Sequence, residues 1–321
     1  NFIDLIELLR LTSLHKLKTA YIVIIAALKS NTDSDTRSPI HLDTVKTLID
    51  LGAEVWFEED VGKGINISNE IFEEIGLKNH TRESCLKNAN LIITNQALEQ
   101  HELEQMKSNS TILGMVSPFS NQDLIKSCSK LKINLVSMEF IPRITRAQKM
   151  DVLSSQANLA GYVAVIESAK YLSSALPMMM TAAGTLKPAK VFVIGVGVAG
   201  LQAIATAKRL GARVEAFDTR DVVEEQVNSL GAKFVKIDLG ETGETDQGYA
   251  KELTEEQIKK QKELQAKVCE RSDIVITTAQ LFGRPAPLLI DNMTIDKMSP
   301  GSVIFDMAVE SGGNVEGSEV D

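Results

Sequence analysis

Three glycines in the second half of the chain have the spacing of a phosphate-binding turn. Gly195, Gly197 and Gly200 follow an apolar run at residues 191–194, in the pattern G-x-G-x-x-G. The first glycine permits a tight turn, the second lets a pyrophosphate approach the backbone, and the third lets the next helix pack closely on the strand. The helix N-terminus then offers N–H groups and a partial positive charge to phosphates. The segment predicts dinucleotide contacts from Gly195, Val196, Gly197, Val198, Ala199 and Gly200.

An acidic residue after the next predicted strand indicates which dinucleotide is favoured. The strand at residues 213–217 leads directly to Asp218, where a carboxylate accepts hydrogen bonds from both ribose hydroxyls of NAD and repels the 2′-phosphate of NADP. Arg220 is of a type that accommodates a 2′-phosphate, but Asp218 has the greater weight because it lies at the strand tip. We therefore predict NAD(H) as the cofactor. A β-α-β unit that binds no nucleotide is the alternative. The remaining predicted contacts are Thr219 at the ribose and, after a later strand, Thr278, Ala279 and Gln280.

Alternating strands and helices are predicted to position these residues in two parallel sheets. Apolar runs predict strands at residues 21–27, 53–59, 91–94, 111–116, 133–138, 191–194, 213–217, 233–238, 273–278 and 302–308. Helices are expected between them, including one capped by Ser38 with Pro39 at its first position, and others at 70–75, 121–131, 154–172 and 251–271. Repeated β-α units predict an α/β fold with two Rossmann-like domains, each a parallel sheet covered by helices.

The same pattern suggests domain boundaries. Residues 1–17 are expected to form a linker helix, 18–141 a first Rossmann-like domain, 142–175 a connecting loop and long helix, and 176–321 the NAD(H)-binding domain. We expect a cleft between the two domains. A polar, glycine-rich stretch from Gly240 precedes the helix at 251–271. It is either a solvated insertion or a mobile lid anchored by Tyr249.

Composition excludes several function classes. The formal charge of −9 argues against nucleic acid and anionic membranes as partners, and the 44% apolar content supports real cores. The three cysteines match no metal spacing and are expected to be buried thiols, and the four histidines form no ligand pattern, so we predict no metal site. No apolar run has the length of a membrane span.

A polar loop lies before the predicted long helix. It places Arg143, Gln148 and Asp151 at spacings of five and three, with Ser154 next along the chain. From the residues alone, Ser154 is a helix cap, and Arg143 and Asp151 form an interdomain ion pair.

Several motifs together resemble one family. The runs PRITRAQ, SSQANLAGY, PMMMTAAGT, GVGVAGLQAIATAKRLGA, GYAKE and DMAVESGGN occur in this order. The chain resembles the NAD(H)-binding component, called domain I, of the proton-translocating nicotinamide nucleotide transhydrogenase, strongly over residues 143–313 and more weakly over 18–139. The resemblance implies direct hydride transfer from NADH here to NADP⁺ on a separate domain, coupled to proton translocation by a membrane domain.

The resemblance also implies roles for the polar loop. Arg143 and Asp151 would orient the nicotinamide, with help from Ser154, while Gln148 would reach the facing NADP ribose. Tyr249 corresponds to the tyrosine of the family's mobile loop. Direct hydride transfer needs close, dry rings and no general acid or base, so the absence of an obvious catalytic His or Lys agrees with it. The resemblance further implies a homodimer on the soluble face of a membrane enzyme, with the compartment left open.

Two alternatives remain. Alanine dehydrogenase shares the fold but needs an arginine, for which Arg37 is available, together with a lysine near residues 91–96 and a histidine near 113–118, which are absent. It also has an aspartate where Glu310 stands here. A non-catalytic NAD-binding regulatory module would need only the glycines and Asp218. Two features depart from the transhydrogenase pattern: a first turn that leaves the roles of Lys29 and Arg37 undefined, and the lack of an expected C-terminal return to the first domain.

Overall fold

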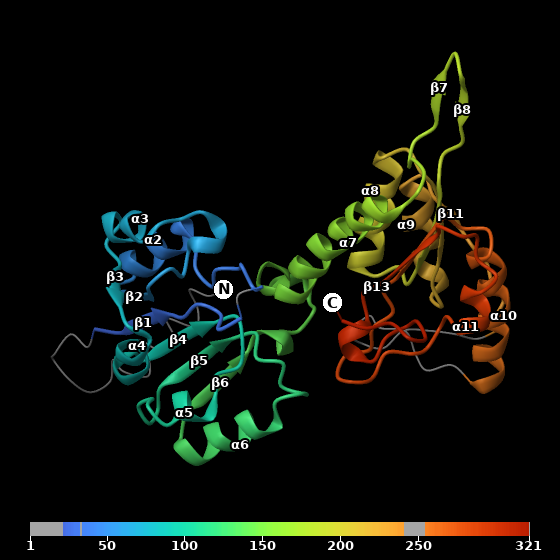
Figure 1. Cartoon of the computed structure of the whole chain (residues 1–321). Helices are drawn as coiled ribbons and strands as arrows, with labels where there is room; N and C mark the ends of the chain where they lie inside the picture. Colours follow the sequence, from blue (N-terminus) through green and yellow to red (C-terminus); the bar gives the residue numbers. More distant parts are fainter. Residues whose placement is uncertain (1–21, 33, 241–253, 321) are drawn as a thin grey trace. The chain divides into compact units, whose positions relative to one another are not determined.

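The structure, a computed structural model, describes residues 22–32, 34–240 and 254–320. The chain divides into two compact units, the first ending at Val152 and the second beginning at Leu153 (Figure 1). The linker helix predicted at residues 1–17 and the tyrosine of the predicted lid, Tyr249, lie outside the described residues. Within those described ranges, no helix combines the length and apolar character of a membrane span.

The first unit is built on a six-stranded parallel sheet in the order β3-β2-β1-β4-β5-β6. Its strands are β1 (Ile24–Ala27), β2 (Glu54–Glu58), β3 (Lys78–His80), β4 (Leu91–Thr94), β5 (Thr111–Gly114) and β6 (Asn134–Ser137). Its helices are α2 (Leu42–Asp50), α3 (Asn69–Glu74), α4 (Arg82–Asn88), α5 (Gln100–Leu103) and α6 (Gln122–Leu131). Successive residues of β1 enter different cores, since Ile25 packs with α2 and α3 and Ala26 packs with α4, α5 and α6. Burial on both faces explains why these strands are continuous apolar runs.

The second unit has a five-stranded parallel sheet in the order β11-β10-β9-β12-β13. Its strands are β9 (Lys190–Ile194), β10 (Arg213–Phe217), β11 (Lys233–Phe234), β12 (Ile274–Thr277) and β13 (Val303–Asp306). Its helices are α7 (Val152–Tyr171), α8 (Val198–Arg209), α9 (Glu224–Ser229), α10 (Glu255–Cys269) and α11 (Asn292–Ile295). The chain enters this sheet at the central β9, moves outward to β11, and returns to β12 on the other side. The strand order therefore reverses between β9 and β12, the point at which open sheets of this class bind ligands.

A close contact holds α7 against the start of α8. A Cβ added at Gly161 would lie 2.2 Å from the carbonyl oxygen of Ala199, so only glycine permits this approach. Another side of α7 is exposed and apolar, with four large residues in the i, i+3, i+4, i+7 spacing of one helix face. These residues are Leu159, Tyr162, Val163 and Ile166. Helix α7 therefore carries apolar residues outside its buried contact with α8.

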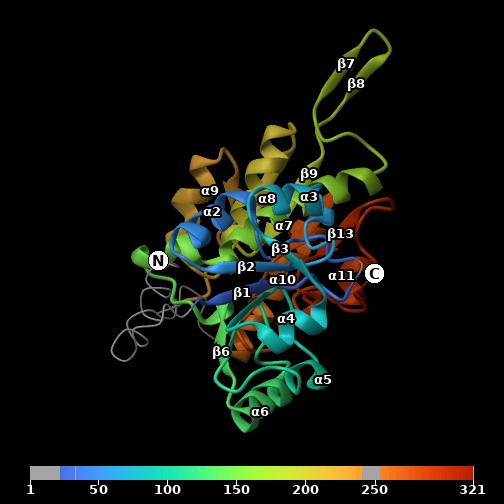
Figure 2. The same cartoon turned by 90° about the vertical axis from the view of Figure 1, so that its left-hand side faces the viewer.

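A two-stranded antiparallel hairpin, β7 (Met179–Thr181) and β8 (Gly184–Leu186), projects from the second unit. Both views show it standing away from the sheet of its own unit (Figure 1, Figure 2). Its apolar side chains are exposed, Met180 at 72%. Sequence analysis predicted no strand here, because three-residue strands carry little alternation.

The predicted α/β class with two parallel sheets is confirmed, and two local predictions are wrong. Helix α2 begins at Leu42 with His41 as its N-cap, because the Ser38 hydroxyl donates to Ile40 O (2.8 Å) instead of capping a helix at Pro39. Strand β11 ends at Phe234, because its pairing with β10 covers only two residues. Short elements such as β3, α4 and α5 were not predicted.

Candidate functional site

The glycine turn lies at the carboxyl end of β9. Gly195 has φ +97°, in the left-handed region that favours glycine, and a Cβ there would lie 2.6 Å from the Thr278 hydroxyl. A Cβ at Gly200 would lie 1.9 Å from Gly195 O. Folding therefore demands glycine at both positions.

Gly197 differs from the other two glycines. Its φ of −85° is open to any residue, and a Cβ there would meet no described atom within 4 Å. It is also the N-cap of α8, and its own lack of a side chain leaves this helix without a side-chain cap. Packing of the described residues gives no reason for glycine here, whereas a phosphate approaching the helix N-terminus does. The turn therefore fits a pyrophosphate.

Asp218 follows β10 directly and lies beside this turn. Its carboxylate accepts from Val196 N (2.7 Å) and from Arg220 N (2.9 Å). The Arg220 guanidinium donates from Nε and Nη2 to the two carboxylate oxygens at 2.9 Å each, and also to Val196 O. The structure thus brings two of the predicted ribose-binding residues into one ion pair against the glycine turn, with Thr219 between them in the chain.

The loop after β12 is bonded to the same turn. Thr278 donates from its backbone to Ile194 O (2.8 Å) and from its hydroxyl to Gly195 O (2.9 Å). Ala279 is held by the Asn314 side chain, and Gln280 donates to the backbone at 307. The predicted contacts after β9, β10 and β12 therefore converge at one edge of the sheet. Sequence reasoning missed Asn314, whose only signal was its place directly after the DMAVESGG run.

The polar loop belongs to the first unit. Arg143 Nε lies 3.8 Å from Asp151 Oδ2, across the 3-10 helix Thr145–Met150 that contains the exposed Gln148. Both charged residues lie in that unit, so the interdomain ion pair suggested by the residues alone is wrong. Ser154 lies in the first turn of α7, within the second unit.

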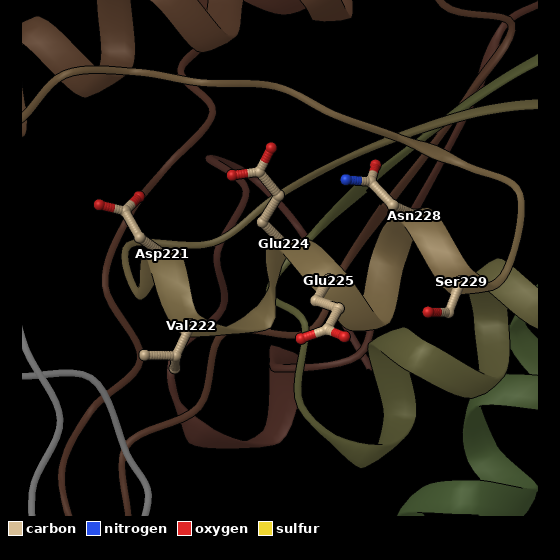
Figure 3. Close-up of a pocket in the computed structure, with 6 residues that line it drawn as sticks. All are labelled: Asp221, Val222, Glu224, Glu225, Asn228 and Ser229. Carbon is tan, nitrogen blue, oxygen red and sulfur yellow. The ribbon is translucent and has the colours of Figure 1, made fainter.

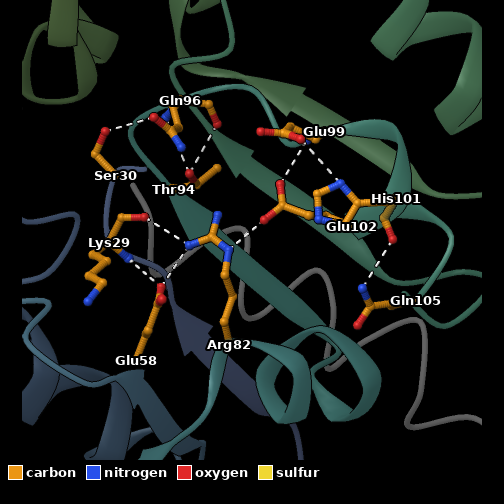
Figure 4. Close-up of polar contacts among 10 residues, drawn as sticks. All are labelled: Lys29, Ser30, Glu58, Arg82, Thr94, Gln96, Glu99, His101, Glu102 and Gln105. Carbon is orange, nitrogen blue, oxygen red and sulfur yellow. Dashed lines mark hydrogen bonds and ion pairs between the residues drawn. The ribbon is translucent and has the colours of Figure 1, made fainter. Parts of the chain in front are cut away.

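A buried polar network occupies the carboxyl edge of the first sheet (Figure 4). Arg82, the first residue of α4, donates to Glu102 (2.5 Å), Glu58 (2.8 Å) and Lys29 O (3.0 Å). Arg37 pairs with its neighbour Asp35 at 2.7 Å. The arginine that alanine dehydrogenase chemistry would require is therefore engaged locally, and the network itself joins α4, α5 and β2.

Other reactive groups offer less. An acidic surface hollow lies along α9 and the turn before it (Figure 3), lined by Asp221, Val222, Glu224, Glu225, Asn228 and Ser229. Its three carboxylates repel phosphate, so it does not extend the glycine turn. Burial raises the pKa of Cys85 and of Cys269 to about 12, which keeps both thiols protonated and unreactive. Over the described ranges, no three His, Cys, Asp or Glu residues are grouped to hold a metal ion.

Comparison with known proteins agrees with this geometry. The family model "Alanine dehydrogenase/PNT, N-terminal domain" matches residues 28–160, and "Alanine dehydrogenase/PNT, C-terminal domain" matches residues 164–321. The fold and the glycine turn define a protein of the doubly wound, Rossmann-like class, with two such units in one chain.

Individual relatives narrow this class. The first of two parts of NAD(P) transhydrogenase subunit alpha from Rickettsia prowazekii is 44% identical over 302 residues, which are 92% of this chain and 79% of that protein. The crystal structure of transhydrogenase from Sinorhizobium meliloti matches with a TM-score of 0.82 at 42% identity, over 92% of this chain and 81% of that one. "Alanine dehydrogenase 1" of Staphylococcus aureus is 25% identical over 304 residues, 92% of this chain and 74% of that protein. The chain belongs to the alanine dehydrogenase/PNT family, and within it to the NAD(P) transhydrogenase alpha subunits, as the sequence motifs predicted.

Proposed function

We propose that this chain is the NAD(H)-binding component of a proton-translocating transhydrogenase. When bound, NADH supplies the hydride that reduces NADP⁺ held by a separate domain, and a membrane domain of the same enzyme couples this step to proton movement. The observation that carries the proposal is the 44% identity to a transhydrogenase alpha subunit across 92% of the chain. We place the chain on the soluble face of that membrane enzyme, with the compartment open.

The second unit supports the binding half of the proposal. The turn at Gly197 leaves room for a pyrophosphate at the N-terminus of α8, and Asp218 lies at the tip of β10 with its carboxylate beside the turn. The adenosine ribose is proposed to bind at Asp218, Thr219 and Arg220. The nicotinamide half extends toward the loop after β12, because the two halves of a dinucleotide lie on either side of the glycine turn.

The polar loop supplies the proposed contacts at the reacting ring. Arg143 and Asp151 orient the nicotinamide and its carboxamide, and Ser154 donates a further hydrogen bond. Gln148, which is exposed, reaches the facing NADP ribose. These side chains bind and orient and exclude water, and none needs to transfer a proton. Tyr249 is proposed as a further contact to the nucleotide.

Turnover with different acceptors tests the proposal against its alternatives. NADH oxidation is measured with the purified chain in two reactions, one with pyruvate and ammonia and one with an NADP⁺-loaded partner domain of a transhydrogenase. Turnover only with the partner domain supports the proposal. Turnover with pyruvate and ammonia would instead make the chain an alanine dehydrogenase, and NADH binding without turnover in either reaction would favour a regulatory module.

A homodimer is part of the proposal. The exposed apolar face of α7 and the projecting hairpin both belong to the second unit, and both are of the kind that a stable partner covers. Leu159, at 59% exposed, lies on the α7 face. We expect Leu159→Glu to convert a dimer to a monomer in sedimentation analysis, while Leu288→Glu, at an exposed site elsewhere in the unit, leaves it a dimer. A monomeric unsubstituted chain would contradict this.

A further inference from the structure

Asp306, at the tip of β13, is the centre of a dense hydrogen-bond cluster in the second unit. Its Oδ1 accepts from the Thr277 hydroxyl and from Ala308 N, each at 2.9 Å. Its Oδ2 accepts from Asn314 N and the Ser318 hydroxyl, each at 2.8 Å, and from the backbone at 315. One carboxylate therefore ties β12 to the turn that follows β13.

That turn presents Asn314 to the loop after β12. Asn314 is fully buried, with 0% exposed. Its Oδ1 accepts from Ala279 N (3.0 Å), and its Nδ2 donates to Ala279 O (2.9 Å) and to Pro287 O (2.8 Å). Both backbone polar groups of Ala279 are thus fixed by one amide.

The held loop is in direct contact with the glycine turn. The neighbouring Thr278 donates to Gly195 O, and a Cβ at Gly195 would lie only 3.2 Å from Ala279 N. A shift of Ala279 would therefore move Thr278 against the turn. The loop lies on the β12 side of β9, whereas Asp218 lies on the β10 side.

We infer that Asn314, oriented by Asp306, is a positioning residue for the nicotinamide half of the bound dinucleotide. It fixes the backbone of Ala279 and Gln280 where that half crosses the switch point between β9 and β12. The inference rests on the proposed function, because it takes NADH as the ligand. The adenosine half, which lies on the β10 side, does not depend on this amide.

Comparing NADH with ADP separates positioning from a purely structural role. ADP carries the adenosine and pyrophosphate but no nicotinamide. We expect Asn314→Ala to raise the Kd for NADH by about tenfold or more, the effect of losing an oriented contact, and to change the Kd for ADP less than about twofold. Both are measured by calorimetry at a temperature where circular dichroism shows the variant folded.

A matched control and a second variant complete the test. Ser272→Ala removes a buried hydroxyl that donates to Val268 O (2.7 Å) at the opposite end of β12, so we expect a lower Tm with both Kd values unchanged. Asp306→Asn keeps the volume at 306 and weakens the cluster, and if Asn314→Ala does not fold, Asp306→Asn must show the same selective loss of NADH.

Equal loss of NADH and ADP binding in the folded variants, or no loss of either, would overturn the inference. Selective loss of NADH binding in a chain that passes no hydride to NADP⁺ would refute the proposed hydride transfer and support the inference, so the two failures are distinct.

Discussion

Asp218 and Arg220 form a two-bond ion pair at the tip of β10, with Arg220 Nε and Nη2 each 2.9 Å from one carboxylate oxygen. The side chains are 7% and 13% exposed. The arginine occupies the carboxylate oxygens that ribose hydroxyls would use, and it offsets the negative charge that would repel a 2′-phosphate. Binding of NADH at Asp218 therefore requires these two residues to exchange partners.

Asp218→Ala is expected to weaken NADH binding by about 1–3 kcal/mol, since it removes charge-assisted hydrogen bonds to the ribose. The substitution also leaves Arg220 without this carboxylate, so the Tm falls as well, and calorimetric titration is made well below it. An unchanged Kd for NADH in the folded variant would remove Asp218 from the site.

Gly197→Ala tests whether ligand approach, and not folding, requires glycine in the middle of the turn. The added methyl group meets no described atom within 4 Å, so the Tm should stay within about 1 °C of the parent value. It would intrude where the pyrophosphate approaches, so the Kd for NADH should rise at least about tenfold. Gly200→Ala is the contrast, because its Cβ would lie 1.9 Å from Gly195 O and should lower the Tm. Normal NADH affinity in Gly197→Ala would place the phosphates elsewhere.

Gln148→Asn separates binding from hydride transfer. Because Gln148 is proposed to reach the facing NADP ribose, shortening it should leave the Kd for NADH nearly unchanged and slow NADPH formation with the partner domain. Stopped-flow measurement of NADPH formation at saturating NADH checks the rate. A large loss of NADH affinity would contradict the assignment of Gln148 to the other nucleotide.

The buried network of the first unit predicts an acid-dependent stability. Burial disfavours ionisation of Glu102, but bonds from Arg82 and from Glu99 N outweigh it and hold the Glu102 pKa below its usual value. A lowered folded pKa stabilises the fold above the unfolded pKa, and this stabilisation is lost as the pH falls through the folded value. Glu102→Gln should therefore lower the Tm most near neutral pH, with the difference from the parent shrinking below about pH 4. Thermal scans across this range check it, and a difference that grows in acid would refute it.

The sequence was most informative where one residue type has one physical use. The glycine spacing and the strand-tip Asp218 were visible because a close turn and an acid after a strand leave local signals. The clamp on Ala279 was not, because Asn314 lies 35 residues away and its partners are backbone atoms. The start of α2 was misjudged because Ser38 and Pro39 satisfy the capping pattern locally, while Ser38 bonds within its own turn. Short polar elements such as α5 carry too few residues for a periodic signal.

The most direct test of the central claim follows the transferred hydrogen itself. NADH carrying deuterium at both C4 positions is mixed with the chain and an NADP⁺-loaded partner domain in ordinary water, and the NADPH formed is analysed by mass spectrometry. Direct transfer between two nicotinamides predicts one deuterium in each NADPH formed. Unlabelled NADPH would mean that the hydrogen passes through a group that exchanges with water, and it would contradict the account.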